Sequence, residues 1–502
     1  MAAKIEITYD WWLDHGESLG LETDAAIIKR WQHSPMLKRR ALLLSDINRV
    51  RWRILFESEK YPTVAKATAD WYTPTVPSSP PPNDGVNTGQ LRIIKTDYVD
   101  SDSYFANAAG ETLPLGITYG PAMWERRVNR GGFQNKLESI SRAGYDFIRS
   151  WCWLGYYNFW RTREISPVDY IGEDGQQIKA WDDWEDQVRG FGEDVANAGL
   201  QLFVSSGDAR IFSSEGLGFK SLENTSRRLG QLLDESGVRI VAADQHEPSS
   251  SLWLYDYVSP TDITKFFINP LQEGYVTPFI HLIGAAPNNT IESLNTWSGD
   301  MVQKHGSTTK FPGDHVSVID QVLAIMSGKD SIPNINLGIE TEPNGPGLCP
   351  EYGGHNDAEV LCLIAAANFI GRFAYVYHSQ HGVRPWEGLM STQPGFNEIP
   401  KIRELLTPLK LHSSYRTIQP SGAPFIIKDG KSHSLIKYSD DHFITIIYGH
   451  MGRTTITAQY PVEFTIITPD TREARKVTLN TEESLTLSYK YGRIIIGQFI
   501  YV

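Results

Sequence analysis

The stretch SLENTSRRLGQLLDESGVRIVAADQHEP, residues 221–248, contains one unit of the repeating pattern that decides the fold. Its first part carries apolar residues at helical spacing and ends at Gly237, and glycine commonly terminates α-helices. The run from Val238 to Asp244 is mostly apolar, as in strands that are buried on both faces of a parallel sheet. The stretch therefore predicts a helix followed by a buried strand.

The same pattern recurs along the middle of the chain. The expected strands are residues 113–120, 145–154, 200–209, 238–248, 277–285, 300–306, 335–343 and 373–382. The clearest helical windows between them are residues 133–144, 184–199, 221–237, 314–328 and 356–372. Eight strands with intervening helices over about 270 residues predict an α/β protein with a (β/α)8 barrel, which takes roughly 250 residues. An open doubly wound sheet is the alternative. Its nucleotide-binding versions are disfavoured because neither of their glycine-rich phosphate-binding motifs is present.

Three further regions flank the expected barrel. Residues 1–72 predict a helical N-terminal segment, and residues 73–100 a proline-rich linker that begins with TPTVPSSPPPNDGVNTG. The barrel is expected over residues 101–411. Apolar and polar residues alternate between turn signals over residues 412–502, which predicts a C-terminal antiparallel β-sandwich domain.

Composition and charge narrow the function classes. The net charge of −12 argues against a nucleic acid partner, because phosphates bind basic surfaces. No run of 18 or more apolar residues occurs, so no membrane partner is expected. The N-terminal sequence is acidic where a signal peptide needs an apolar core, which predicts a cytoplasmic protein, or one that is virion-associated or released by lysis. The 14 Trp and 23 Tyr residues favour a carbohydrate partner, although aromatic residues also fill large cores.

Acidic residues follow two of the expected strands. The fourth strand leads into His246-Glu247-Pro248, and the seventh into Glu340-Thr341-Glu342-Pro343. Active sites of (β/α)8 barrels lie at the C-terminal ends of the strands, so these acids are expected across the barrel mouth from each other. One carboxyl group that protonates a leaving oxygen and a second that attacks the anomeric carbon are what glycoside hydrolysis requires. Structural acids that cap helices or form ion pairs are the alternative interpretation of Glu247 and Glu340.

On these residues the sequence resembles the clan A glycoside hydrolases, whose barrels carry a Glu acid/base after the fourth strand and a Glu nucleophile after the seventh. The segment 337–345, LGIETEPNG, is similar to the nucleophile segment of the clan's β-galactosidase branch. FANAAGETLP, residues 105–114, resembles the hairpin that often precedes these barrels, and GYDFIR, residues 144–149, resembles the second-strand segment that ends in an arginine. The similarity covers about residues 100–400 by pattern rather than close identity.

The resemblance implies roles for particular residues. Glu247 would be the acid/base and Glu340 the nucleophile, with Glu342 the rival, while Arg149 and His305 would tune the nucleophile. Two departures affect substrate binding: His246 stands where the clan has an Asn that bonds the sugar 2-hydroxyl, and the eighth strand ends in Tyr377-His378-Ser379 rather than in the usual Trp.

Further side chains are expected around the substrate. Trp160 and Trp386 follow strands on the loop side and are the best candidates for sugar platforms, although each could equally be core packing. His378 and His381 resemble a metal pair but have no third ligand at metal-like spacing, so neither a metal nor a cofactor is expected. Cys152 and Cys362 lie in apolar runs and are expected to be core thiols.

The sequence thus predicts a metal-independent, retaining glycosidase that acts on an oligo- or polysaccharide. The alternative is a non-catalytic glycan-binding or structural barrel of a virion or cell-surface assembly, with a homo-oligomer or a particle contact formed through residues 1–72. A metal-dependent hydrolase is a third class, disfavoured because no His-x-His ends the first strand.

Overall fold

The chain divides into two compact units, residues 1–87 with 95–103, and residues 88–94 with 104–502. The structure, a computed structural model, describes parts of the second unit. The described residues are 92–94, 104–107, 110–152, 166–171, 177–205, 218–244, 264–285, 301–304, 315–316, 319–320, 339–341, 357–370, 374–409, 411, 416–417, 423–428, 433–438, 442–450 and 452–500. The N-terminal segment 1–72 lies outside them.

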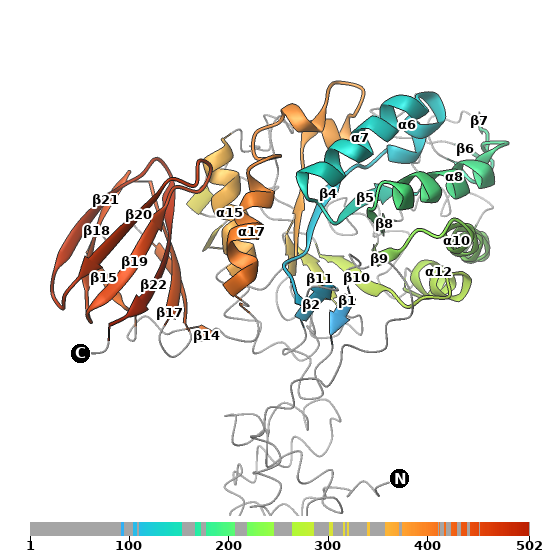
Figure 1. Cartoon of the computed structure of the whole chain (residues 1–502). Coiled ribbons are helices and arrows are strands. Elements are labelled where there is room, and N and C mark those ends of the chain that lie inside the picture. The colour runs from blue at the N-terminus through green and yellow to red at the C-terminus, as the bar shows by residue number, and fades with distance from the viewer. Residues whose placement is uncertain are drawn as a thin grey trace, which may run out of the picture. The chain divides into compact units, whose positions relative to one another are not determined.

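Eight parallel strands form a closed barrel in chain order (Figure 1). They are β4 (Leu115–Thr118), β5 (Phe147–Trp151), β8 (Gln201–Ser205), β9 (Ile240–Asp244), β10 (Ile280–Ala285), β11 (Met301–Lys304), β12 (Ile339–Thr341) and β13 (Tyr375–Tyr377). Pairing of β13 with β4 closes the ring, with Tyr375 opposite Leu115. Each of the eight apolar runs expected to be strands contains one of these strands, and the predicted parallel α/β class is confirmed.

Helices follow the strands and cover the outer face of the barrel (Figure 1). Those described around the barrel are α6 (Ala122–Val128), α7 (Arg130–Ala143), α8 (Trp184–Asn197), α10 (Gly218–Glu235), the π-helix η2 (Thr264–Ile268), α12 (Asn269–Gly274), α15 (Ala358–Ile370), α16 (Gln380–Val383) and α17 (Ile399–Leu406). Outward strand residues such as Ile117 and Leu202 join helical residues such as Phe133 in one apolar core. Cys152 and Cys362 are buried free thiols, as predicted.

The amphipathic windows form helices whose ends follow capping rules. Asn129 begins α7 by accepting a hydrogen bond from the N–H of Gly132, and Gly144 ends it with φ of 97°. Gly199 and Gly237, which follow α8 and α10, also have positive φ. Glycine therefore terminates these helices because it adopts the left-handed conformation without steric cost.

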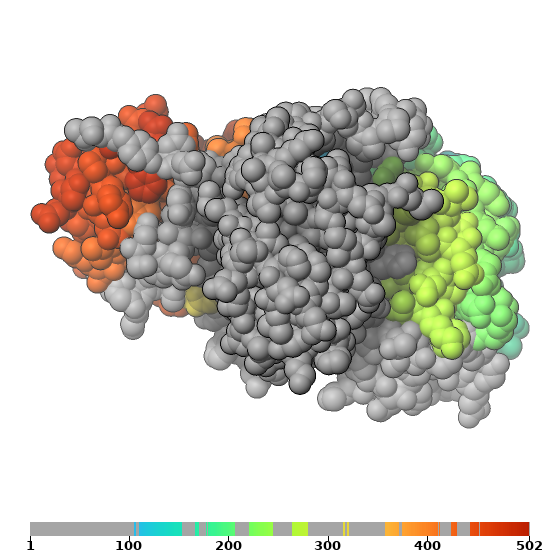
Figure 2. All heavy atoms as spheres, turned by 90° about the horizontal axis from the view of Figure 1, so that it is seen from below, coloured from blue at the N-terminus to red at the C-terminus, as the bar shows by residue number. Residues whose placement is uncertain are grey.

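Close packing of α10 on α12 was not evident from the sequence. A Cβ atom on Gly230 would lie 2.3 Å from the carbonyl oxygen of Leu271, and one on Gly274 would lie 2.1 Å from that of Arg227. Figure 2 shows these two helices, in green and yellow-green, side by side at the surface. Two glycines that face the opposite backbone let these helices approach more closely than larger residues would allow.

The expected strand over residues 373–382 is shorter than predicted. Strand β13 ends at Tyr377, and the side chain of Ser379 then accepts a hydrogen bond from the N–H of Gly382 and caps α16. The polar run His378-Ser379-Gln380-His381 was thus wrongly assigned to the strand, because a serine that caps a short helix competes with strand pairing.

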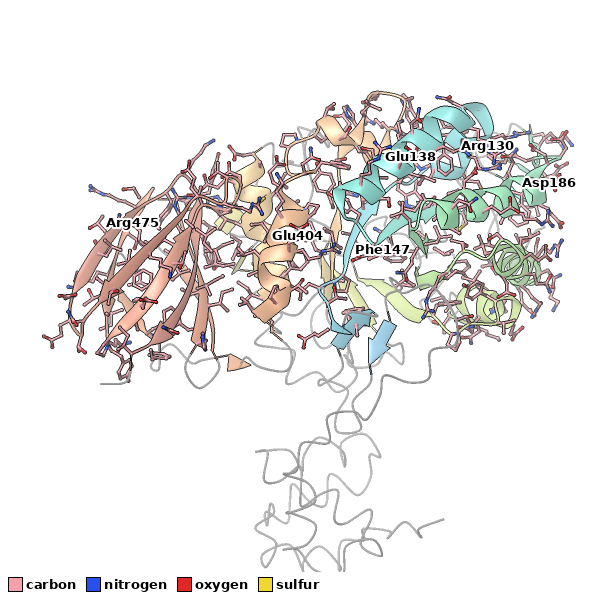
Figure 3. All side chains as sticks on the ribbon, in the orientation of Figure 1. Arg130, Glu138, Phe147, Asp186, Glu404 and Arg475 are labelled. Atoms are coloured by element: carbon pink, nitrogen blue, oxygen red, sulfur yellow. The ribbon has the colours of Figure 1, made fainter. Side chains whose placement is uncertain are left out.

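The barrel interior is packed from alternate strand residues. Phe147, Phe203, Ala242 and Val376 belong to one interior cluster, whereas their neighbours Ile148 and Val204 belong to the outer core. Phe147, labelled in Figure 3, lies at the start of β5. A small antiparallel sheet of β1 (Arg92–Ile94), β2 (Tyr104–Asn107) and β3 (Gly110–Glu111) contributes Phe105 to this cluster. The hairpin β2–β3, expected before the barrel, therefore covers its N-terminal end, where Phe147 lies.

Two antiparallel sheets form the C-terminal region. The larger runs in the order β14 (Arg416–Thr417), β16 (His433–Tyr438), β17 (His442–Tyr448), β22 (Gly492–Phe499), β19 (Val462–Ile467) and β20 (Ala474–Leu479). The smaller runs in the order β15 (Phe425–Ile427), β18 (Arg453–Ala458) and β21 (Ser484–Ser488). Residues of both sheets, including Phe443, Phe464, Ile456 and Leu487, share one apolar cluster. The two sheets therefore pack face to face around their own core.

Polar contacts join this region to α15. Glu359, which is buried, accepts hydrogen bonds from the N–H groups of Tyr491 and Gly492 and from the guanidinium of Arg493. In addition, Tyr448 donates a hydrogen bond of 3.0 Å to Asp320. Within the described part of the chain, no helix is both long and apolar enough to cross a membrane.

Candidate active site at the C-terminal ends of the barrel strands

The strands that carry the two predicted catalytic acids occupy well-separated places in the barrel. Strand β9 ends at Asp244 and β12 at Thr341, and β10 and β11 lie between them. Glu340 is the middle residue of β12, and its backbone pairs with Gln303 of β11. Glu340 therefore belongs to the last strand residues before the C-terminal end of the barrel, where catalytic groups of this fold lie.

Five predicted site residues lie outside the described residues. His246 and Glu247 follow the end of β9, His305 directly follows β11, Glu342 directly follows β12, and Trp160 lies in the connection after β5.

Arg149 is described and lies inside the barrel. Its side chain is fully buried in the middle of β5, and its guanidinium carbon lies 5.2 Å from the centre of the Phe203 ring. In the strand register, Arg149 lies beside Thr118 of β4 and Phe203 of β8. Burying a guanidinium is costly unless an anion or several acceptors surround it, so this position is typical of a functional arginine rather than of a surface charge.

Thr118 and Ser205 are two further polar residues that the sequence analysis missed. Both are fully buried, and both lie at the C-terminal ends of their strands. Thr118 is the register partner of Arg149, and Ser205 is the partner of both Trp151 and Asp244. The only signal in the sequence is a hydroxyl side chain at the end of an apolar run. That signal is weak, because serine and threonine also end many structural strands.

A bulge near the start of β9 changes which of its residues face the barrel interior. The partner of Leu202 is Ile240, but the partner of Phe203 is Ala242, so Val241 is an extra residue in the ladder. Both Val241 and Ala242 consequently join the interior cluster. The bulge therefore sets the direction of the β9 side chains that follow it, up to Asp244 at the C-terminal end of the strand.

The ring of Trp386 packs against the ring of Trp124. The two rings are 5.5 Å apart at 81°, an edge-to-face pair, and both are partly buried. Trp386 follows α16 and Trp124 lies in α6, so both come from connections after the neighbouring strands β13 and β4. The Gly120 N–H donates to the carbonyl oxygen of Gly382 at 3.0 Å, which attaches α16 to the end of β4. The pair therefore lies on the same side of the barrel as the strand ends that carry the acids.

One of the two histidines considered as a metal pair contacts a backbone carbonyl group. The Nδ1 atom of His381 lies 3.0 Å from the carbonyl oxygen of Leu389. Among the residues that the structure describes, no three His, Cys, Asp or Glu side chains gather as metal ligands. His378 and His381 thus gain no third ligand in the described part of the chain.

Tyr377, which stands near the place of the clan's usual Trp, faces the helical layer. Its hydroxyl donates a hydrogen bond of 2.8 Å to the carbonyl oxygen of Pro394, and its ring packs near Tyr145 and Phe396. Burial, and then the nearby Glu398 carboxylate, raise the pKa of Tyr377. Tyr377 therefore stabilises the contact between β13 and the segment around Pro394 and is not part of the barrel mouth.

Among the comparisons with known proteins, only the one with solved structures finds similar proteins, and these share the barrel fold. No family model matches the sequence, and no curated protein matches it. The fold is similar to that of a solved structure described as a glycoside hydrolase, with a TM-score of 0.55, 12% identity, and coverage of 82% of this chain and 97% of that one. It is also similar to a glycoside hydrolase family 5 structure from Bacteroides vulgatus, with a TM-score of 0.56, 11% identity, and coverage of 81% and 93%. At these identities the similarity shows the fold alone, which is the fold expected from the sequence resemblance.

Proposed function

We propose that this protein is a retaining glycoside hydrolase that cleaves O-glycosidic bonds of an oligo- or polysaccharide. Glu247 acts as the general acid/base and Glu340 as the nucleophile, and neither a metal nor a cofactor takes part. The single observation that carries the proposal is the position of Glu340 in β12, the seventh strand of a closed barrel whose fourth strand leads into Glu247. The fold similarity to two glycoside hydrolases supports it.

The mechanism assigns each carboxyl group one task. Glu340 attacks the anomeric carbon and forms a covalent glycosyl–enzyme intermediate, while Glu247 protonates the departing oxygen and then deprotonates the water that releases the sugar. Retention of configuration requires the two carboxyl groups to be about 5–5.5 Å apart, whereas inversion requires roughly 6.5–9.5 Å. Glu340 must stay ionised, and Glu247 must stay protonated until it acts.

Arg149 is proposed to be a positioning residue for Glu340. Its buried guanidinium lies in the barrel interior beside Phe203, and a buried positive charge favours the ionised form of a neighbouring carboxyl group. His305, which follows β11 next to β12, is proposed to act on the same carboxylate from the other side. Trp386, Trp160 and His246 are proposed to contact the sugar.

Hydrolysis of a panel of aryl glycosides and polysaccharides tests this proposal. We expect the full-length protein to cleave at least one member, and Glu340→Gln to reduce kcat by several orders of magnitude because the nucleophile is lost. Glu342→Gln is the matched control, since it makes the same change two residues further along and should retain most of the activity. If Glu342→Gln abolishes hydrolysis and Glu340→Gln does not, the nucleophile is Glu342. Proton NMR of the first anomer released distinguishes retention from inversion.

A non-catalytic glycan-binding or structural barrel is the second candidate function, and His246 is the observation that favours it. This residue replaces the Asn that bonds the sugar 2-hydroxyl in the clan that the sequence resembles. The same glycan panel decides between the two functions: binding without any hydrolysis by the wild type would support the second. Light scattering of the full chain and of a chain lacking residues 1–87 would then show whether these residues form an assembly contact.

A further inference from the structure

A cavity of about 530 Å³ lies at the start of α8, and its lining includes none of the residues proposed for catalysis. Its walls include Trp181, Trp184 and Pro167, with Asp182, Asp183 and Glu185 between them and Asn224 of α10 opposite. The volume falls within the range of about 300–1,000 Å³ that is typical of small-ligand sites. It therefore has room for one or two sugar rings rather than for a water or an ion alone.

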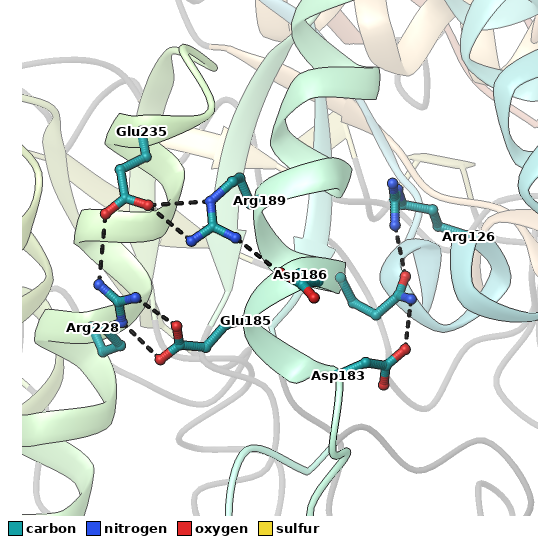
Figure 4. A network of polar contacts seen from close by, with 8 residues as sticks. Arg126, Asp183, Glu185, Asp186, Arg189, Arg228 and Glu235 are labelled. Carbon is teal, nitrogen blue, oxygen red and sulfur yellow. Dashed lines mark hydrogen bonds and ion pairs between the residues drawn. The ribbon is translucent and has the colours of Figure 1, made fainter.

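Ion pairs hold the walls of this cavity in place (Figure 4). Arg228 of α10 binds Glu185 through two contacts of 2.8 and 2.5 Å, and it also approaches Glu235. On the other side, Arg127 lies 2.8 Å from Asp183, and its guanidinium carbon is 4.4 Å from the centre of the Trp181 ring. Because both arginines are engaged with carboxylates, the cavity does not offer a free cation to an anionic ligand.

The pKa values of two carboxyl groups in the cavity, those of Glu185 and Asp183, are lowered by their neighbours. Hydrogen bonds from Arg228 lower the pKa of Glu185. Burial opposes ionisation of Asp183, but hydrogen bonds from Gln187 and Arg127 lower its pKa overall. Asp182 is 94% exposed at the cavity edge, and one of its oxygens lies 3.3 Å from the Arg127 guanidinium, which leaves the other to a ligand. The lining thus presents hydrogen-bond acceptors beside aromatic rings, which suits a ligand with hydroxyl donors and C–H faces.

Trp184 supplies a donor that its own surroundings do not use. Its side chain is 6% exposed and lines the cavity, and its indole N–H has no hydrogen-bond partner among the described residues. A buried donor without an acceptor costs free energy, and a ligand oxygen that reached this N–H would remove that cost. This is the observation beyond charge and shape that indicates a polar ligand.

We propose that this cavity is a second saccharide-binding site, which holds an uncharged segment of a glycan chain against Trp181 while the barrel mouth acts on another segment. The choice of glycan as ligand rests on the proposed function, whereas the cavity itself does not. Four carboxylates and no free cation exclude acidic sugars, and the aromatic walls provide stacking surfaces for neutral ones.

Affinity electrophoresis in gels that contain neutral or acidic polysaccharides tests this site, together with hydrolysis of the same polymers and of short aryl glycosides. Trp181→Ala removes the stacking surface. Asn224→Arg fills the cavity from an exposed helical position, where an arginine does not disturb folding. Tyr460→Ala is the matched control, because Tyr460 is an exposed aromatic residue in the turn between β18 and β19 of the C-terminal region.

We expect both cavity variants to weaken retention by a neutral polymer about tenfold, which corresponds to the loss of one stacking contact, and to leave aryl glycoside hydrolysis unchanged. Tyr460→Ala should behave as wild type in both assays. The second site is overturned if the polymer retains both cavity variants as strongly as the wild type. It is also overturned if acidic polymers retain the protein more strongly than neutral ones, even if hydrolysis is intact. Retention that depends on Trp181 and Asn224 in a protein that hydrolyses nothing supports the site and overturns the proposed function.

Discussion

A Cβ atom on Gly116 would lie 2.0 Å from Cε2 of Phe147, so the missing side chain at position 116 gives the Phe147 ring its place in the barrel interior. The same relationship recurs four residues later, where a Cβ on Gly120 would lie 2.4 Å from the Trp151 ring. Strand β4 and the residues after it thus leave room for two aromatic rings of β5, and Arg149 lies between those rings in the sequence. Packing at these glycines therefore holds the strand that carries Arg149.

Gly116→Ala is expected to destabilise the protein by about 1–3 kcal/mol, because the added methyl group displaces a buried ring that has little room to move. Urea denaturation followed by circular dichroism measures the change. Gly131→Ala is the matched control: it makes the same change in α7, where nothing lies within 4 Å, and should be neutral or stabilising by up to about 1 kcal/mol. Equal stability of the two variants would contradict the packing role of Gly116.

Arg149→Gln is expected to lower kcat/KM and to move the acid limb of its pH profile to higher pH. A nearby positive charge lowers the pKa of a carboxyl group, so its removal lets Glu340 become protonated at higher pH. The measurement is the pH dependence of hydrolysis of the best aryl glycoside. Arg142→Gln is the control, because Arg142 is 77% exposed and pairs with Glu138 on the surface of α7. A loss of rate with an unshifted profile would show that Arg149 only supports the fold.

Asp194→Asn is expected to destabilise the protein in a pH-dependent way. Asp194 is buried between α6, α7 and α8. Burial alone would raise its pKa, but hydrogen bonds from Arg130, Gln134 and Arg126 lower it overall. Since its pKa is lower in the folded than in the unfolded chain, where it is about 3.9, the ionised group stabilises the fold above that pH and loses this effect as pH falls through the folded pKa.

The free energy of unfolding of Asp194→Asn should therefore be lower than that of the wild type by about 2 kcal/mol at pH 7, and the difference should shrink below about pH 4. Urea titrations at pH 7 and pH 3 provide the comparison. Asp186→Asn, at a side chain that is 83% exposed, should change stability by less than about 0.5 kcal/mol at either pH. A difference that stays constant or widens towards pH 3 would refute the argument.

Glu359→Ala is expected to weaken the attachment of the C-terminal sheets to α15. Its buried carboxylate accepts from two backbone N–H groups and from Arg493, and its removal leaves all three without this acceptor, at a cost of about 3 kcal/mol. Calorimetry and limited proteolysis would report the change as a lower Tm and faster cleavage. Lys490→Ala breaks the adjacent, exposed pair with Asp357 and should cost less than about 1 kcal/mol. If both variants melt alike, Glu359 does not have this role.

The sequence predictions succeeded where the signal depends only on a short segment of the chain. Apolar runs and glycine stops located the eight strands and the helices α7, α8, α10 and α15, because period and capping are properties of short segments. The hairpin at residues 104–111 also lies where the sequence resemblance placed one. The end of β13 was wrong, since Ser379 is equally compatible with a strand and with a helix cap.

The candidate site was predictable only in part. Its strand positions follow from the chain order of acids and apolar runs, and this order put Glu340 in β12. The pairing of Trp386 with Trp124, the polar residues Thr118 and Ser205, and the cavity at α8 were not predictable, because each depends on contacts between distant segments.

The sequence by itself determined which segments become strands and helices, and which acids stand near strand ends. Only the tertiary structure decided that the ring of Phe147 lies over Gly116, that Val241 forms a bulge opposite Phe203, and that Arg228 binds Glu185 beside Trp181. The physical reason is that periodicity and capping act over a few neighbouring residues, whereas packing and ion pairs depend on which distant surfaces meet when the barrel closes.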